Sequence, residues 1–158
     1  MAQKITTFLT FNDQAEEAVN LYTSVFKNAK ILSTTRYGEE GPGPKGSLMT
    51  AEFQLDRQEF VALNGGPSFA FSEGISLLVH CDTQPEIDEF WEKLSEGGEK
   101  GPCGWLKDRF GVSWQVVPRV LGEMLSDKDP EKSKRVMNAM LQMSKIDISG
   151  LKQAYEQA

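Results

Sequence analysis

The chain has 158 residues, of which 39% are hydrophobic and 25% are charged, and its formal net charge is −6. This length and composition fit one globular domain, residues 1–158, with a hydrophobic core of its own. The acidic balance and the scattered basic residues argue against nucleic acid as a partner, and no apolar run is long enough to cross a membrane. The N-terminus lacks a signal-peptide pattern. The cysteines Cys81 and Cys103 lack metal-ligand spacing, so we expect a cytoplasmic protein with reduced thiols.

The first half of the chain predicts a strand, a helix and three further strands. A strand over Ile5–Phe11 is followed by Asp13 and Glu16, which have the spacing of a helix capping box. The apolar spacing predicts a helix over Gln14–Phe26, and the later strands are predicted at Ile31–Tyr37, Leu48–Leu55 and Glu59–Leu63. The loop Gly38–Ser47 is rich in Gly and Pro. Two interpretations stay open for it, a lid over a pocket or a disordered solvent loop.

The second half of the chain repeats this order. A strand over Ile75–Cys81 leads to the capping box Thr83-Gln84-Pro85-Glu86, and the following helix ends at Gly97-Gly98. Three more strands are predicted near Glu99–Gly101, at Trp105–Phe110 and at Val112–Val117. One register aligns the two helices and their caps: Asp13 with Asp82, Glu17 with Glu86, Ala18 with Ile87, Leu21 with Phe90, Tyr22 with Trp91, and Val25 with Leu94. The two halves are therefore interpreted as an internal repeat.

The remaining residues predict a helical tail over 119–158. Asp129-Pro130-Glu131 is typical of a helix start, and Ser149 is a candidate cap for a last short helix. Val136, Met140 and Met143 form an apolar stripe. Such stripes more often pack than bind ligands, and we expect this one to cover a sheet edge or a subunit contact.

Three segments resemble PhnB-like proteins. They are the run from Phe11 to Ala18 (FNDQAEEA), the run from Ala62 to Pro67 (ALNGGP) and, most specifically, the run from Gly101 to Pro118 (GPCGWLKDRFGVSWQVVP). This group, often called the 3-demethylubiquinone-9 3-methyltransferase domain, is a branch of the vicinal-oxygen-chelate superfamily, with the glyoxalases, the bleomycin-resistance proteins and the extradiol dioxygenases.

The resemblance implies an α+β fold. Two βαβββ modules, over about 3–66 and 74–118, would form a curved, eight-stranded, cup-shaped mixed sheet around a small-molecule pocket, and the helical tail would follow. The resemblance also implies a homodimer, which in some relatives exchanges modules between chains. The sequence leaves the presence of an exchange open.

Enzymes of the wider superfamily hold a divalent metal through the first and last strands of each module. At those positions this chain offers Thr6, Asn64, Ile75 or Ser76, and Gln115. Hydroxyl and amide groups are weak ligands for a transition metal, so we expect no metal and no cofactor, although a weak site at Gln115 stays open. We instead predict that Thr6, Asn64, Ser76 and Gln115 contact a small molecule, with Trp105 in the pocket wall.

His80 and Cys103 are the candidate catalytic residues. His80 is the single histidine and has the chemistry of a general base; the repeat aligns it with Phe11, which favours packing. Cys103 would be a nucleophile if Lys107 or Arg109 stabilised its thiolate; the alternative is a small residue in a tight turn. Asp108-Arg109 and Asp56-Arg57 are interpreted as turns with surface ion pairs.

The residues are compatible with three functions. The chain either converts a small oxygen-rich or quinone-like molecule without a metal, sequesters such a molecule, or is a structural dimer with a vestigial pocket. Gly38-Glu39-Glu40-Gly41-Pro42-Gly43 follows a strand, but its prolines and the absence of a following helix exclude a dinucleotide-type loop. No motif for S-adenosylmethionine is present, so the residues do not support methyltransferase activity.

Overall fold

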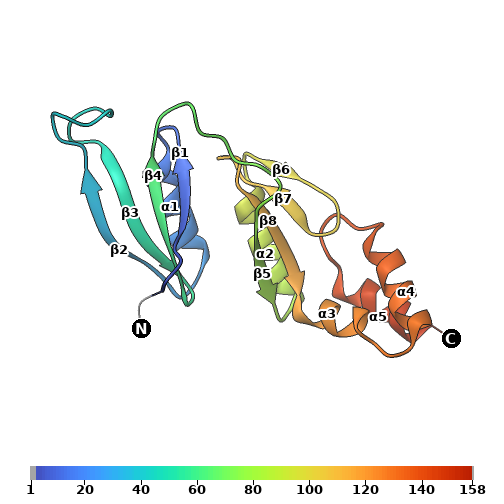
Figure 1. The fold of residues 1–158 in the computed structure, drawn as a ribbon. Helices are drawn as coiled ribbons and strands as arrows, with labels where there is room; N and C mark the ends of the chain where they lie inside the picture. The colour runs from blue at the N-terminus through green and yellow to red at the C-terminus, as the bar shows by residue number, and fades with distance from the viewer. Residues whose placement is uncertain (1–2, 158) are drawn as a thin grey trace. The chain divides into compact units, whose positions relative to one another are not determined.

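A computed structural model describes residues 3–157, and the chain divides into two compact units, Met1–Ala70 and Phe71–Ala158. Each unit contains one βαβββ module, and the second also contains the tail (Figure 1). Among the described residues, no helix combines the length and the apolar character that a membrane crossing requires.

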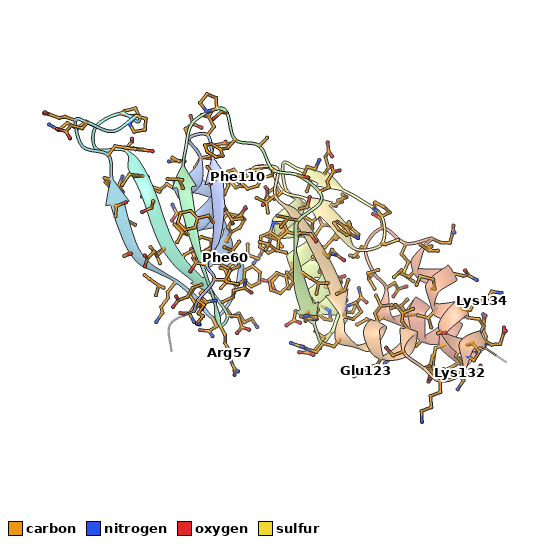
Figure 2. The ribbon with its side chains drawn as sticks, viewed as in Figure 1. Arg57, Phe60, Phe110, Glu123, Lys132 and Lys134 are labelled. Atoms are coloured by element: carbon orange, nitrogen blue, oxygen red, sulfur yellow. The ribbon has the colours of Figure 1, made fainter. Side chains whose placement is uncertain are left out.

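The first module is a four-stranded sheet with one helix against one of its faces. Its elements are β1 (Thr7–Phe11), α1 (Ala15–Val25), β2 (Ala29–Arg36), β3 (Leu48–Leu55) and β4 (Gln58–Asn64). The strand order is β1-β4-β3-β2, in which β1 pairs with β4 in parallel and the other pairs are antiparallel. Tyr22 of α1 packs against Phe53, which stacks on Phe60 with ring centroids 5.3 Å apart. Arg57 extends from the β3–β4 turn into solvent (Figure 2).

The second module repeats this topology. Its elements are β5 (Ser76–Cys81), α2 (Gln84–Ser95), β6 (Glu99–Lys100), β7 (Trp105–Lys107) and β8 (Ser113–Pro118). The strand order is β5-β8-β7-β6, again with one parallel pair, β5 with β8. The predicted α+β fold of two βαβββ modules is therefore confirmed. The predicted strand over Trp105–Phe110 is too long, because Asp108 begins a turn that Gly111 closes.

The repeat shifts by one residue between helix and strand. The helix alignment pairs Phe11 with His80, but the buried positions Leu9 and Phe11 of β1 correspond to Val79 and Cys81 of β5. His80 is exposed. The expected packing position for His80 is therefore wrong, and Cys81 occupies that position.

The two module helices are capped in different ways. The predicted cap of α2 is confirmed: Thr83 accepts a hydrogen bond from the backbone of Glu86, whose carboxylate accepts one from Asp82 N. The predicted capping box at Asp13 is wrong, because the N-cap residue of α1 is Gln14, without a side-chain cap bond. Instead Oδ1 of Asn64, at the end of β4, accepts a hydrogen bond of 2.9 Å from Ala15 N.

The tail forms three helices, α3 (Arg119–Leu125), α4 (Pro130–Met140) and α5 (Ile148–Glu156). Asp129 caps α4 as predicted, but Asp147 and not Ser149 caps α5. The predicted apolar stripe packs within the tail, and Val117 of β8 packs against the same cluster. The alternative of a subunit contact stays a prediction. Val136 lies in one cluster with Leu121, Met124, Ile146 and Leu151, and Met140 and Met143 are packed against that cluster.

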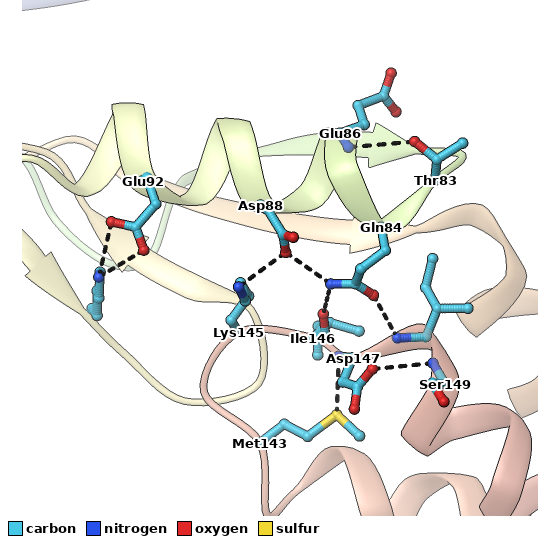
Figure 3. A network of polar contacts seen from close by, with 12 residues as sticks. Thr83, Gln84, Glu86, Asp88, Glu92, Met143, Lys145, Ile146, Asp147 and Ser149 are labelled. Atoms are coloured by element: carbon cyan, nitrogen blue, oxygen red, sulfur yellow. Dashed lines mark hydrogen bonds and ion pairs between the residues drawn. The ribbon is translucent and has the colours of Figure 1, made fainter.

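Polar contacts fasten the tail to α2 (Figure 3). The side-chain amide of Gln84 donates to the carbonyl of Ile146 at 3.0 Å and accepts from Ile148 N at 2.8 Å. Lys145 forms an ion pair of 3.0 Å with Asp88. The segment before α5 is thus held along the first turns of α2.

Candidate functional site

The second sheet has one face covered by α2 and one face that points away from it. Leu106, Trp114 and Val116 are buried on the α2 side. Because side chains alternate along a strand, their neighbours in sequence point to the other face. We call this second set the open face; it comprises Ser76, Leu78, His80, Glu99, Trp105, Lys107, Ser113, Gln115 and Val117. Within it, Ser113 is buried and Val117 packs against the hydrophobic cluster of the tail.

The strand register arranges the open face in rows. One row runs from Leu78 through Gln115 to Trp105, and the next runs from Ser76 through Ser113 and Lys107 to Glu99. The side-chain amide of Gln115 donates a hydrogen bond of 3.0 Å to the hydroxyl of Ser76. Three of the predicted ligand-binding residues, Ser76, Trp105 and Gln115, therefore lie together on one face.

Lys107 adds a charge to this face. Its ammonium nitrogen lies 2.6 Å from a carboxylate oxygen of Glu73, in the segment that leads into β5. The hydrogen bond to Glu73 raises the pKa of Lys107, and the same bond lowers the pKa of Glu73. Sequence reasoning considered Lys107 only as a neighbour of Cys103. Because side chains alternate along β7, Lys107 lies on the same face as Trp105, and this alternation is the sequence signal that indicates its position.

Asp108 is a buried residue that connects β7 to β8 through hydrogen bonds of its carboxylate. The predicted turn at Asp108-Arg109 is confirmed, but the predicted surface position is wrong for Asp108, which is only 2% exposed. One carboxylate oxygen accepts hydrogen bonds from Phe110 N and Val112 N, and the other accepts one of 2.9 Å from the indole of Trp114. Arg109 lies over the ring of Phe110. Asp108 follows Lys107 at the end of β7, and its hydrogen bonds reach Val112 and Trp114, the neighbours of Ser113 at the start of β8. These bonds therefore hold the ends of the two strands together.

The tail holds the turn that precedes β7. Cys103 has a left-handed backbone, with φ of 57°, and donates its N–H to the carbonyl of Met143 at 2.8 Å. The next N–H, from Gly104, is bonded to the carbonyl of Ser144 at 2.8 Å. These two bonds fix the chain direction immediately before Trp105.

The two thiols differ in their surroundings. Cys81 is buried on the α2 side of β5, and burial raises the pKa of its thiol to about 12. A thiol with that pKa stays protonated at neutral pH and is a poor nucleophile. Cys103 is half-buried in its turn. The catalytic roles suggested for Cys103 and His80 remain predictions.

The other two predicted ligand-binding residues belong to the first unit. Thr6 is exposed and immediately precedes β1. The side-chain amide of Asn64 caps α1 and also donates to the carbonyl of Leu48 at 3.1 Å, so both ends of this amide contact backbone. The backbone carbonyl of Asn64 accepts a hydrogen bond from the hydroxyl of Tyr37.

The loop after β2 wraps around Tyr37. The backbone of Tyr37 exchanges hydrogen bonds with Ser47 and Gly46, which closes the loop at its base. Gly41 and Gly43 lie so close to the aromatic ring that a Cβ atom at either position would stand 2.4 or 2.5 Å from a ring carbon. The loop is therefore an ordered cover for Tyr37, and a role as a lid stays a prediction.

Two further observations concern possible sites. Within residues 3–157, no group of three or more His, Cys, Asp or Glu side chains is placed to hold a metal ion. A surface hollow of about 420 Å³ lies beside the C-terminal end of α2, lined by Glu92, Lys93, Ser95, Glu96 and Lys100.

Comparisons with known proteins place this architecture. Residues 3–117 match the family described as 3-demethylubiquinone-9 3-methyltransferase. The solved structure of the PhnB protein from Bacillus cereus is 42% identical, with a TM-score of 0.67 over 73% of this chain and 99% of that one. A search of curated proteins found no match.

Two more distant structures share the fold. Protein PA1353 from Pseudomonas aeruginosa is 23% identical, with a TM-score of 0.61 over 74% of this chain and 98% of that one. The fosfomycin resistance protein FosX from Listeria monocytogenes, solved with manganese(II) and sulfate, is 17% identical, with a TM-score of 0.56 over 80% of this chain and 99% of that one. From the family match and the Bacillus cereus structure, the chain belongs to the PhnB-like family described as 3-demethylubiquinone-9 3-methyltransferase.

Proposed function

We propose that the open face of the second sheet binds a small, planar, oxygen-bearing molecule without a tightly bound metal. The observation that carries this proposal is the meeting of Ser76, Trp105 and Gln115 from three strands on one face, with a hydrogen bond between Gln115 and Ser76. An indole offers a flat apolar surface, and small-molecule sites combine such surfaces with a few placed polar groups.

Gln115 is the polar anchor in this proposal. A carboxamide has two N–H donors and a carbonyl acceptor, and the bond to Ser76 uses one of the donors. That bond also orients the amide before a ligand arrives, which reduces the cost of ordering it on binding. An oxygen of the ligand would accept from the amide while its ring lies against Trp105.

The test is binding of small probes to the full chain, measured by titration calorimetry. Suitable probes are 4-hydroxybenzoate, 4-hydroxybenzamide and duroquinone, a fully substituted quinone to which thiols do not add. We expect at least one to bind, and Gln115→Ala and Trp105→Ala each to weaken its binding about fivefold, because each removes a contact worth roughly 1 kcal/mol.

Gln153→Ala, at an exposed position of α5, is the matched control and should leave binding unchanged. The proposal fails if no probe binds, or if the Gln115 and Trp105 variants bind as the wild type does. Chemical analysis of the recovered probe separates sequestration, which returns it unchanged, from conversion.

We also propose that the protein is a cytoplasmic homodimer. The edge strands β1 and β2 carry exposed apolar side chains, with Phe8 at 55%, Ile31 at 44% and Leu32 at 39%, and exposed apolar groups on edge strands favour association. Both cysteines are free thiols, which fits a reducing compartment. Light scattering coupled to size-exclusion chromatography should give about twice the chain mass of 17.6 kDa. A measured mass equal to that of one chain at every protein concentration would contradict the dimer.

A further inference from the structure

The open face carries a charge that the proposed function does not use. Among the residues of β5–β8 that form this face, Lys107 has the one permanent positive charge. It is the diagonal cross-strand neighbour of Gln115, because Lys107 pairs with Ser113 and Gln115 pairs with Trp105. Diagonal neighbours on one sheet face lie within reach of long side chains.

Glu73 forms an ion pair with Lys107 in the free protein. The contact is 2.6 Å long, yet the side chain of Lys107 is 36% exposed and that of Glu73 is 72% exposed. Exposed ion pairs add little to stability. Glu73 also lies outside the strands, next to a turn in which Gly74 N is bonded to the hydroxyl of Ser72. Turning the Glu73 side chain into solvent therefore breaks one weak contact and no sheet hydrogen bond.

We propose that Lys107 recognises a single carboxylate group on the ligand, and that Glu73 occupies its place until the ligand displaces it. This inference rests on the proposed function and names the class of ligand: a planar ring against Trp105, an oxygen at Gln115 and a carboxylate at Lys107. The ligand carboxylate makes the same charge-assisted hydrogen bond that the Glu73 carboxylate makes in the free protein.

The surrounding charges limit the ligand to one negative charge. Glu99 pairs with Lys107 in the sheet register and lies in the same row. With Glu73 displaced but still nearby, one ammonium group faces two carboxylates of the protein. A doubly charged group such as a phosphate monoester would meet more repulsion than attraction there. A monocarboxylate carries the same single negative charge as the Glu73 carboxylate that it displaces from Lys107.

The experiment compares matched acids and amides on the full chain by titration calorimetry at low ionic strength. The probe pairs are 4-hydroxybenzoate with 4-hydroxybenzamide, and 6-hydroxy-2-naphthoate with 6-hydroxy-2-naphthamide. The wild type should bind each acid roughly five- to tenfold more tightly than its amide, as expected for one partly exposed charge-assisted hydrogen bond. Lys107→Met should remove that preference and leave amide binding nearly unchanged.

Glu73→Gln gives a second, opposite readout. Because it removes the competing carboxylate, it should tighten binding of the acids about two- to fivefold, whereas a purely structural ion pair would give no gain. Lys93→Met and Glu89→Gln, from the exposed ion pair on α2, are the matched controls and should bind all probes as the wild type does.

The outcomes separate this inference from the function on which it rests. If acids and amides bind equally well and Gln115→Ala weakens both, the binding face stands and the carboxylate site is overturned. The site is also overturned if Lys107→Met keeps the preference for acids, or if Glu73→Gln weakens acid binding. If no probe binds, both proposals fail.

Discussion

Replacement of Asp108 by alanine is expected to lower the free energy of unfolding by about 3 kcal/mol or more, because it leaves buried donors without an acceptor at roughly 1–3 kcal/mol each. The donors are Val112 N and the indole nitrogen of Trp114, which lose bonds of 3.0 and 2.9 Å to the carboxylate. Trp114 is only 2% exposed, so water does not readily replace the lost acceptor. The measurement is urea unfolding followed by far-UV circular dichroism.

Asp108→Asn distinguishes the roles of the two carboxylate oxygens. An asparagine keeps one acceptor oxygen, which is able to serve Phe110 N and Val112 N, but its amino group then faces the donor of Trp114. We expect a loss of about half that of the alanine variant. Asp13→Ala is the matched control: Asp13 is exposed and is not the N-cap residue of α1, so its loss should stay within about 0.5 kcal/mol. An Asp108→Ala variant as stable as the wild type would refute the buried role of this carboxylate.

Replacement of Gly98 by alanine is expected to cost about 2 kcal/mol or more, in the range found for overpacked sites. A Cβ atom at Gly98 would stand 2.1 Å from the carbonyl oxygen of Lys107 and 2.7 Å from the carbonyl carbon of Asp108. Both atoms belong to the backbone, so no side-chain rotation relieves the clash. The strand pairing between β6 and β7 must open instead, which also moves Lys107.

Gly122 provides the comparison for Gly98. It lies within α3, and a Cβ atom added there would meet no heavy atom within 4 Å beyond its own helix backbone and chain neighbours. Gly122→Ala should therefore stabilise the chain by up to about 1 kcal/mol through helix propensity. Thermal unfolding of both variants is the measurement. Equal effects of the two substitutions would contradict the close approach of Gly98 to β7.

Local sequence signals predicted the elements that local contacts determine. The capping box of α2 lies within four consecutive residues, Thr83 to Glu86, and the structure contains it. The repeat of helix and strands was visible because apolar spacing and caps recur within each half. Both βαβββ modules could therefore be predicted from the chain alone.

Long-range contacts account for the wrong predictions. The cap of α1 comes from Asn64, 49 positions along the chain from Ala15, and no local sequence pattern predicts this contact. Asp108 looked like a surface turn residue because its charge favours solvent. It is buried because the turn directs Phe110 N, Val112 N and the Trp114 indole toward its carboxylate. His80 was misplaced because strand and helix repeat with slightly different spacing.

The candidate site was predictable in part. The superfamily's metal positions singled out Ser76 and Gln115, and Trp105 was predicted for the pocket wall. Only the strand register shows that all three lie on one face. The pairing of Lys107 with Glu73 was not predictable, because Glu73 lies in the segment that joins the modules. Asn64 was expected at a ligand, and its side-chain amide instead contacts the backbone at Ala15 and Leu48.

The most direct test of the central claim is a map of probe binding on the full chain by ¹H–¹⁵N correlation spectroscopy with 4-hydroxybenzoate. The account predicts that the largest shifts occur at the Gln115 side-chain amide, the Trp105 indole and the backbone of Ser76 and Lys107. The indole of Trp91, buried on the α2 side, should stay unchanged. Shifts concentrated in the tail helices or around the hollow lined by Glu92 and Lys100 would contradict the assignment of the open face as the binding site.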